Sequence, residues 1–245
     1  MFTHASSNRV FLLSPASCSG RRAEILLREQ AAFDLAVRLR TPEGATLGEA
    51  FSFLSGLYFR GKLAYATCFG STVAGVSKAL VITAGSGLLA PESAVTIDSL
   101  RTFASVPIDV SEPRYFEPLQ RDAEQLAERL NRECRVVLLG SIATAKYRDV
   151  LAKTLGDRLD FPTEFIGRGD MSRGGLLLRC VDAGCELQYA PLTGAIFRGA
   201  RPAKLAPRMK LGGGTNKEKK LAEIATENPP PPSSGLANGA GNQPS

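Results

Sequence analysis

Short apolar runs that alternate with helical patterns limit what this chain can fold into more than any other feature. Three runs, at residues 10–13, 79–83 and 135–139, are rich in leucine and β-branched residues and end in small or turn-forming residues. Runs of this length and composition are typical of buried strands. Because helical patterns lie between them, the sequence predicts an α/β fold: a mixed central sheet with helices on both faces.

Three segments carry the helical signals. Residues 114–132 place four apolar side chains on one helical stripe: Leu119, Ala123, Leu126 and Leu130. Thr46 and Glu49 have the spacing of a capping box ahead of an apolar segment at 50–57. Gly156 is placed to end a helix over residues 145–155.

The length of 245 residues is typical of one domain with an appendage. We expect a disordered start at 1–9, an α/β domain at 10–196, a basic arm at 197–211 and a disordered tail at 212–245, which is rich in proline, glycine and serine. The arm is either a solvated connection or a strap that contacts phosphates, and its cations are Arg198, Arg201, Lys204, Arg208 and Lys210. The prolines at 229–232 form either a spacer or a ligand for a proline-reading domain.

Charge, histidine and cysteine content restrict the chemistry. A net charge of +6 favours anionic partners. His4 is the only histidine, which argues against His-dependent catalysis, and the five cysteines lack the spacing of a zinc site. The sequence therefore predicts no metal and indicates no cofactor. Residues 3–9 are polar rather than signal-like and no apolar run is long enough to span a membrane, so we expect a cytoplasmic protein without a membrane partner.

The segments after the three apolar runs are candidate ligand-binding loops, because open α/β sheets bind ligands beyond the carboxyl ends of their strands. Hydroxyls, glycines and cations in these segments would contact an anionic ligand. The candidates are Ser14, Arg21, Arg22, Ser86, Gly87, Ser141, Lys146 and Tyr147. Cys18 is a candidate nucleophile, although a structural thiol is the alternative that we favour.

Two further segments combine cations with aromatic residues or glycines. Phe59, Arg60 and Lys62 lie between Tyr58 and Tyr65, a pattern that suits base stacking and phosphate contact, although we expect Tyr65 to pack in the core. The run 167–175 contains four glycines, which allow close backbone approach, and its candidate ligand contacts are Arg168, Gly169, Met171, Ser172 and Arg173. Asp170 is the candidate acid–base group, or else the partner of Arg168 or Arg173 in a surface ion pair.

Taken in order, these segments resemble the peroxide-stress protein YaaA family and its distant α/β relatives associated with modified-base transfer. The resemblance spans about residues 10 to 190. It rests on Leu12-Leu13-Ser14-Pro15-Ala16, Phe59-Arg60-Gly61-Lys62 with Tyr65, Ser86-Gly87-Leu88 with Pro91, the strand at 136–139 with Lys146-Tyr147, and Arg168-Gly169-x-Met171-Ser172-Arg173. Ser17 stands where the family usually has a lysine.

The resemblance implies a cytosolic α/β protein that binds DNA and is linked to protection against oxidative damage. Our first hypothesis is therefore a nucleic-acid-binding protein, with DNA favoured over RNA and a free nucleotide as a further possible ligand. The alternative is an enzyme that acts on a nucleobase or nucleotide by base exchange or glycosidic-bond chemistry. In that case Asp170 or Glu92 would be the acid–base group.

Overall fold

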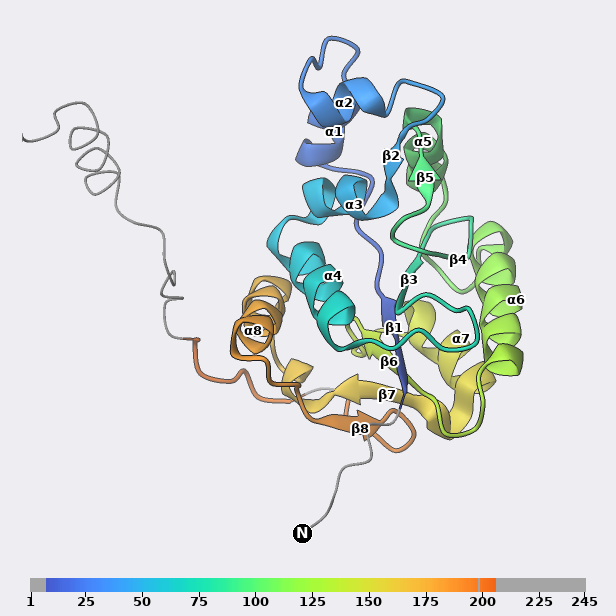
Figure 1. The fold of residues 1–245 in the computed structure, drawn as a ribbon, viewed down its shortest axis with the longest axis vertical. Helices are drawn as coiled ribbons and strands as arrows, with labels where there is room; N and C mark the ends of the chain where they lie inside the picture. The colour runs from blue at the N-terminus through green and yellow to red at the C-terminus, as the bar shows by residue number, and fades with distance from the viewer. Residues whose placement is uncertain (1–7, 198, 206–245) are drawn as a thin grey trace, which may run out of the picture. The chain divides into compact units, whose positions relative to one another are not determined.

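The computed structural model describes residues 8–197 and 199–205. These residues form an α/β fold with a mixed central sheet (Figure 1). The described part holds a six-stranded sheet with the order β4-β3-β1-β6-β7-β8 and a two-stranded sheet that pairs β2 with β5. The strands are β1 (Arg9–Leu13), β2 (Ala45–Thr46), β3 (Ala79–Ile82), β4 (Leu88–Leu89), β5 (Ala94–Val95), β6 (Arg135–Leu139), β7 (Leu159–Pro162) and β8 (Tyr189–Pro191).

The central strands are parallel and the edge strands are antiparallel. In β1, Phe11 lies between Ala79 of β3 and Val137 of β6, in parallel register with both. Strand β7 continues the parallel series beside β6, whereas β4 and β8 close the two edges in the opposite direction. The three predicted runs are β1, β3 and β6, so the prediction of a mixed sheet is confirmed.

Helices cover both faces of this sheet (Figure 1). Helices α4 and α8 pack against each other on one face, and α6 and α7 pair on the other. The helices are α1 (Arg21–Leu27), α2 (Asp34–Arg38), α3 (Leu47–Ser55), α4 (Leu57–Phe69), α5 (Ile97–Ser105), α6 (Pro113–Arg129), α7 (Ala145–Leu155) and α8 (Asp170–Ala183), with short 3-10 turns η1 (Gly156–Arg158) and η2 (Thr163–Phe165). The predicted helices at 114–132 and 145–155 are confirmed as α6 and α7.

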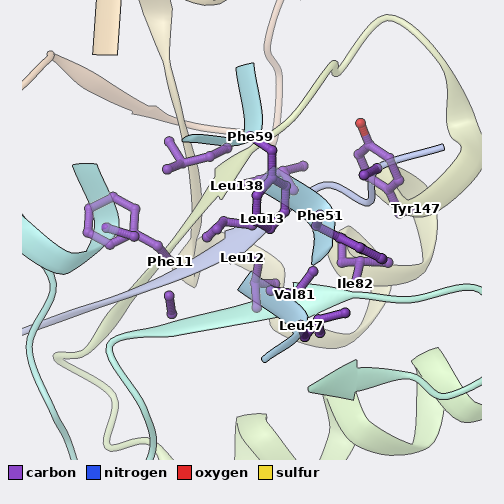
Figure 2. Packing of buried hydrophobic residues seen from close by; sticks show 14 of the residues in the cluster. Phe11, Leu12, Leu13, Leu47, Phe51, Phe59, Val81, Ile82, Leu138 and Tyr147 are labelled. Carbon is purple, nitrogen blue, oxygen red and sulfur yellow. The ribbon is translucent and has the colours of Figure 1, made fainter. Parts of the chain in front are cut away.

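The hydrophobic core lies on both sides of β1, which explains why the strand sequences are apolar without alternation. Figure 2 shows Leu12 and Leu13 of β1 among side chains of β3, β6 and the covering helices. The ring of Phe11 meets that of Tyr65 edge-on at 5.6 Å. The Tyr65 hydroxyl lies 2.6 Å from that of Tyr189 and accepts a hydrogen bond from the Leu187 amide, so the expected core role of Tyr65 is confirmed.

Two glycines allow α4 and α8 to approach closely. A Cβ added to Gly61 would lie 2.7 Å from the Gly174 carbonyl oxygen, and one added to Gly174 would lie 2.7 Å from the Cα of Tyr58. The sequence interpretation of both segments needs correction here. Residues 59–62, predicted to stack on a base and contact phosphate, lie inside α4. Helix α8 begins within the run 167–175, where Gly174 contacts another helix instead of a ligand.

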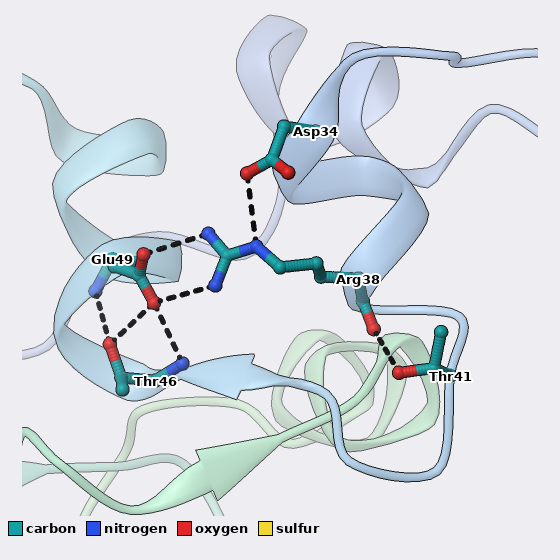
Figure 3. Close-up of polar contacts among 5 residues, drawn as sticks. All are labelled: Asp34, Arg38, Thr41, Thr46 and Glu49. Atoms are coloured by element: carbon teal, nitrogen blue, oxygen red, sulfur yellow. Dashed lines mark hydrogen bonds and ion pairs between the residues drawn. The ribbon is translucent and has the colours of Figure 1, made fainter.

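A polar network joins α2 to α3 beside the small sheet (Figure 3). Arg38 forms ion pairs with Asp34 at 3.0 Å and with Glu49 at 2.7 Å. Thr46 and Glu49 exchange the two hydrogen bonds of a capping box, which confirms the predicted start of this helix. The hydrogen bonds from Arg38 and Thr46 lower the pKa of Glu49 to about 2.

Some sequence expectations lie outside the described residues. These are the disorder of 1–7 and 212–245, the proline run, and the arm residues Arg198, Arg208 and Lys210. The expected disorder of residues 1–9 is wrong at Arg9, which begins β1 and forms an ion pair with Glu186. Among the described residues, no helix has both the length and the apolar character needed to cross a membrane.

Candidate functional site

The site lies at the carboxyl ends of β1 and β6. The connection that leaves β1 leads to β3, and the one that leaves β6 leads to β7 on the other side, so the two loops separate and leave a crevice between them. A cavity of about 900 Å³ opens there. It is bordered by residues 14–23, by residues of the 141–147 segment, and by side chains of α3, α4, α5 and α8.

The first wall is the loop that follows β1. Ser14 borders the cavity although it is only 6% exposed. The exposed Arg21 and Arg22 also line it. Arg22 donates a hydrogen bond from Nη1 to the Phe53 carbonyl oxygen at 3.0 Å, which holds this arginine against the end of α3.

The second wall is the loop that leads from β6 into α7. The Tyr147 hydroxyl accepts a hydrogen bond from the Ser141 amide at 2.9 Å, and the exposed Lys146 adds a cation. A Cβ on Gly140 would lie 2.8 Å from the Tyr147 hydroxyl oxygen and 2.9 Å from the Cβ of Ser14. Glycine at this position therefore lets the two walls meet at Ser14 and Tyr147.

The start of α8 supplies one carboxylate to the cavity. Asp170 borders it and also forms an ion pair with Arg173 at 3.3 Å. Arg173 is buried and donates two hydrogen bonds to the Phe165 carbonyl oxygen. The prediction that its guanidinium contacts a ligand therefore does not fit the structure. Of the two alternatives for Asp170, the ion pair is observed, and the position beside the cavity keeps the acid–base role open.

Lys62 lies behind the cavity wall and is fully buried. Its Nζ donates to the Ser14 carbonyl oxygen at 2.5 Å and to the Ser14 Oγ at 2.8 Å, and it faces the Tyr58 ring at 4.5 Å. Burial lowers the pKa of Lys62 to about 7; Asp170 opposes this effect and Arg173 adds to it. The prediction that Lys62 contacts a phosphate directly is wrong, because Ser14 separates its amine from the cavity.

Other predicted residues also lie apart from the cavity. Phe59 is fully buried against Phe51, so it cannot stack on a base, and Arg60 points to solvent from α4. Ser86 and Gly87 belong to a turn against α6: the Asp122 carboxylate accepts a hydrogen bond from the Leu88 amide, and a Cβ on Gly87 would collide with that carboxylate. From this segment only Ala84, among the described residues, borders the cavity.

The run 167–175 reaches the cavity only through Asp170, the first residue of α8. Arg168 donates to the Glu164 carbonyl oxygen and to the Ser172 hydroxyl, which ties it to its own turn. Met171 is 67% exposed, and neither it nor Gly169 borders the cavity. The distinctive part of the Arg-Gly-x-Met-Ser-Arg pattern is thus divided between a surface turn and the buried Arg173.

Cys18 borders the cavity but is not an activated thiol. Burial raises its pKa to about 12, whereas a nucleophilic cysteine needs a lowered pKa. The burial of Cys18 fits the structural alternative better than a nucleophile.

Sequence reasoning missed the apolar wall, which comes from α3 and the end of α5: Phe51, Leu54, Phe103, Val106 and Ile108. Phe51, Leu54 and Phe103 lie inside helices, and Val106 and Ile108 follow one, so no strand-end signal could find them. Tyr58 also borders the cavity, and its buried hydroxyl has no hydrogen-bond partner among the described residues. Burial raises the pKa of Tyr58, and the nearby Arg173 opposes this rise.

Comparison with protein-family models, curated proteins and solved structures found no match. Within the described residues, no group of three or more His, Cys, Asp or Glu side chains is placed to hold a metal ion.

Proposed function

We propose that the protein binds a nucleotide unit, as part of a DNA strand or free, in the strand-end cavity. The observation that carries the proposal is the lining of this cavity. Three cations, Arg21, Arg22 and Lys146, line it together with one carboxylate, Asp170. Among the described residues none of these cations is in an ion pair, so their charges remain for a ligand.

The size and composition of the cavity fit such a ligand. Its volume of about 900 Å³ lies within the range of small-molecule sites, about 300–1,000 Å³. Aromatic and apolar side chains of α3, α4 and α5 would contact a planar base, while Arg21, Arg22 and Lys146 would contact its phosphate. The net charge of +6 and the resemblance to the peroxide-stress YaaA family also favour DNA.

A base inside a duplex cannot enter a cavity of this kind without leaving the stack. Single-stranded DNA should therefore bind more tightly than the same sequence in a duplex. The test is fluorescence anisotropy with a labelled single-stranded oligonucleotide over a series of salt concentrations. Log affinity should fall linearly with log salt, by about 0.7 for each phosphate neutralised on a single strand.

The decisive variants are Arg21→Met and Lys146→Met, with Lys78→Met as the matched control. Lys78 is exposed and directly precedes β3, so it lies at the amino ends of the parallel strands, whereas the cavity lies at the carboxyl ends of β1 and β6. Each cavity variant should weaken binding and make the salt slope shallower, and the control should change neither. Binding that is independent of salt, or equal losses in all three variants, would refute the proposal.

A second candidate function is supported by the position of Asp170 beside the cavity. Here the protein would act on a nucleobase or nucleotide, with Asp170 as the acid–base group. Asp170→Asn should then abolish release of a base from nucleosides or DNA. Equal release by this variant and the wild type would remove the assignment.

A further inference from the structure

Ser14 stands between the cavity and the buried amine of Lys62. Its hydroxyl lies 2.8 Å from Nζ, and the residue borders the open space in which a ligand would sit. A serine becomes a nucleophile when an adjacent base takes its proton, and Ser–Lys pairs are one of the recurring arrangements that do this without histidine. The only histidine of the chain is His4, so a lysine is the natural candidate for this base.

The surroundings of Lys62 favour the neutral amine that such a base requires. In the described residues, no carboxylate lies within ion-pair distance of Nζ, and Tyr58 and Phe59 offer it only their rings. Asp170 and Arg173 of α8 are the charged groups that act on it, with opposite effects. A neutral amine can donate one N–H to the Ser14 carbonyl oxygen and turn its lone pair toward the Ser14 hydroxyl, which then donates the hydrogen bond.

Tyr147 completes the arrangement from the other wall. Its hydroxyl oxygen already accepts the Ser141 amide, so its own proton is left for another acceptor. Burial raises the pKa of Tyr147, and contacts with the Ser141 amide and the Ser14 side chain oppose the rise. The phenol is thus placed to donate to the Ser14 oxygen or to a carbonyl oxygen bound beside it.

We propose that Ser14 is a nucleophile with Lys62 as its general base, and that the cavity hydrolyses carboxylic esters of anionic compounds. The anionic character of the substrate rests on the proposed function. Arg21, Arg22 and Lys146 would contact the negative charge of this substrate.

In the first step, the Ser14 Oγ bonds to the ester carbonyl carbon while its proton moves to the Lys62 Nζ. The bond from that carbon to the leaving oxygen then breaks, and Lys62 returns the proton to the leaving alkoxide, which departs as an alcohol. In the second step, water attacks the acyl group on Ser14 and gives a proton to Lys62. The carboxylic acid leaves, and Lys62 returns that proton to Ser14.

The test is a fluorophosphonate probe on the full-length protein, with mass spectrometry to locate the modified residue. Such probes react with activated serines by losing fluoride. We expect the label on Ser14, and we expect Ser14→Ala to abolish it. Lys62→Met should lower both the labelling rate and the hydrolysis of p-nitrophenyl acetate by roughly 100-fold or more, which is the lower end of a general-base contribution.

The matched controls are Ser77→Ala and Lys78→Met, which should label like the wild type. Both residues precede β3, at the amino ends of the parallel strands and therefore away from the cavity. The labelling rate should rise with pH through one titration near 7, the value to which burial lowers the pKa of Lys62. A label on another residue, no label on a wild-type protein with a folded circular dichroism spectrum, or equal rates in Lys62→Met would overturn the proposal.

Competition with adenosine monophosphate separates this proposal from the proposed function. Slower labelling of Ser14 in its presence supports both. Labelling of Ser14 that saturating nucleotide does not change would support the Ser14–Lys62 pair and overturn the nucleotide as its ligand.

Discussion

Replacing Lys62 with methionine should change how the stability of the protein depends on pH. Burial lowers the pKa of Lys62 from its ordinary 10.5 to about 7 in the folded state. Between these two values the unfolded chain binds one more proton than the folded chain, so the free energy of unfolding rises with pH, by up to about 1.4 kcal/mol per pH unit. From pH 7 to pH 9 the wild type should gain about 2 kcal/mol relative to Lys62→Met.

The assay is urea unfolding followed by circular dichroism at pH 7, 8 and 9, with both proteins under reducing conditions. Methionine is close to lysine in length and is apolar, so it can fill the same buried space. The other groups that titrate in this range are the same in both proteins, so their contributions cancel in the difference between the two free energies of unfolding. The exposed Lys78→Met variant is the control and should follow the wild type. A stability difference that is the same at pH 7 and pH 9 would show that folded Lys62 keeps its proton, and would refute the reasoning.

Four further predictions concern the packing and capping of helices. Gly174→Ala should lower the free energy of unfolding by about 1–3 kcal/mol, because its Cβ meets α4 backbone atoms at 2.7–2.9 Å, and an unchanged melting temperature would contradict this. Gly175→Ala, one residue along the same helix, should be neutral or stabilising by up to about 1 kcal/mol, because its Cβ meets only side-chain atoms; a large loss would contradict it. Thr46→Ala should cost about 1 kcal/mol through the lost cap, measured by urea unfolding. The pKa of Glu49 is lowered from 4.5 to about 2, so its stabilising effect should be complete above pH 4.5 and lost on acidification toward pH 2; a Glu49→Gln variant should not show this loss.

The central strands could be predicted because both faces of the sheet are covered. A strand buried on both sides needs apolar residues at every position, so β1, β3 and β6 carry a strong local signal. The capping box at Thr46 is also local, because both partners lie within one turn. The helix that begins at Asp170 could not be recognised, since glycine has low helix propensity. The contact between Gly61 and Gly174, which accounts for both glycines, joins residues far apart in the chain.

The site was predictable where it follows strands and unpredictable where it depends on burial. Ser14, Ser141 and Tyr147 were found from their places after β1 and β6. The pattern around Lys62 predicts a cation that contacts phosphate, because the segment carries no clear helical signal. Once α4 is known, the spacing of Tyr58, Lys62 and Tyr65 places the lysine on the buried face of that helix. The order of residues offers no sign that its amine meets Ser14.

The claim that the strand-end cavity holds a nucleotide is tested most directly by photo-cross-linking with azidoadenosine monophosphate, followed by mass spectrometry of the labelled peptides. The account predicts label on the peptides that carry Tyr58 and Tyr147, and competition by unlabelled nucleotide. Label confined to residues away from the cavity, or label that unlabelled nucleotide does not displace, would contradict it.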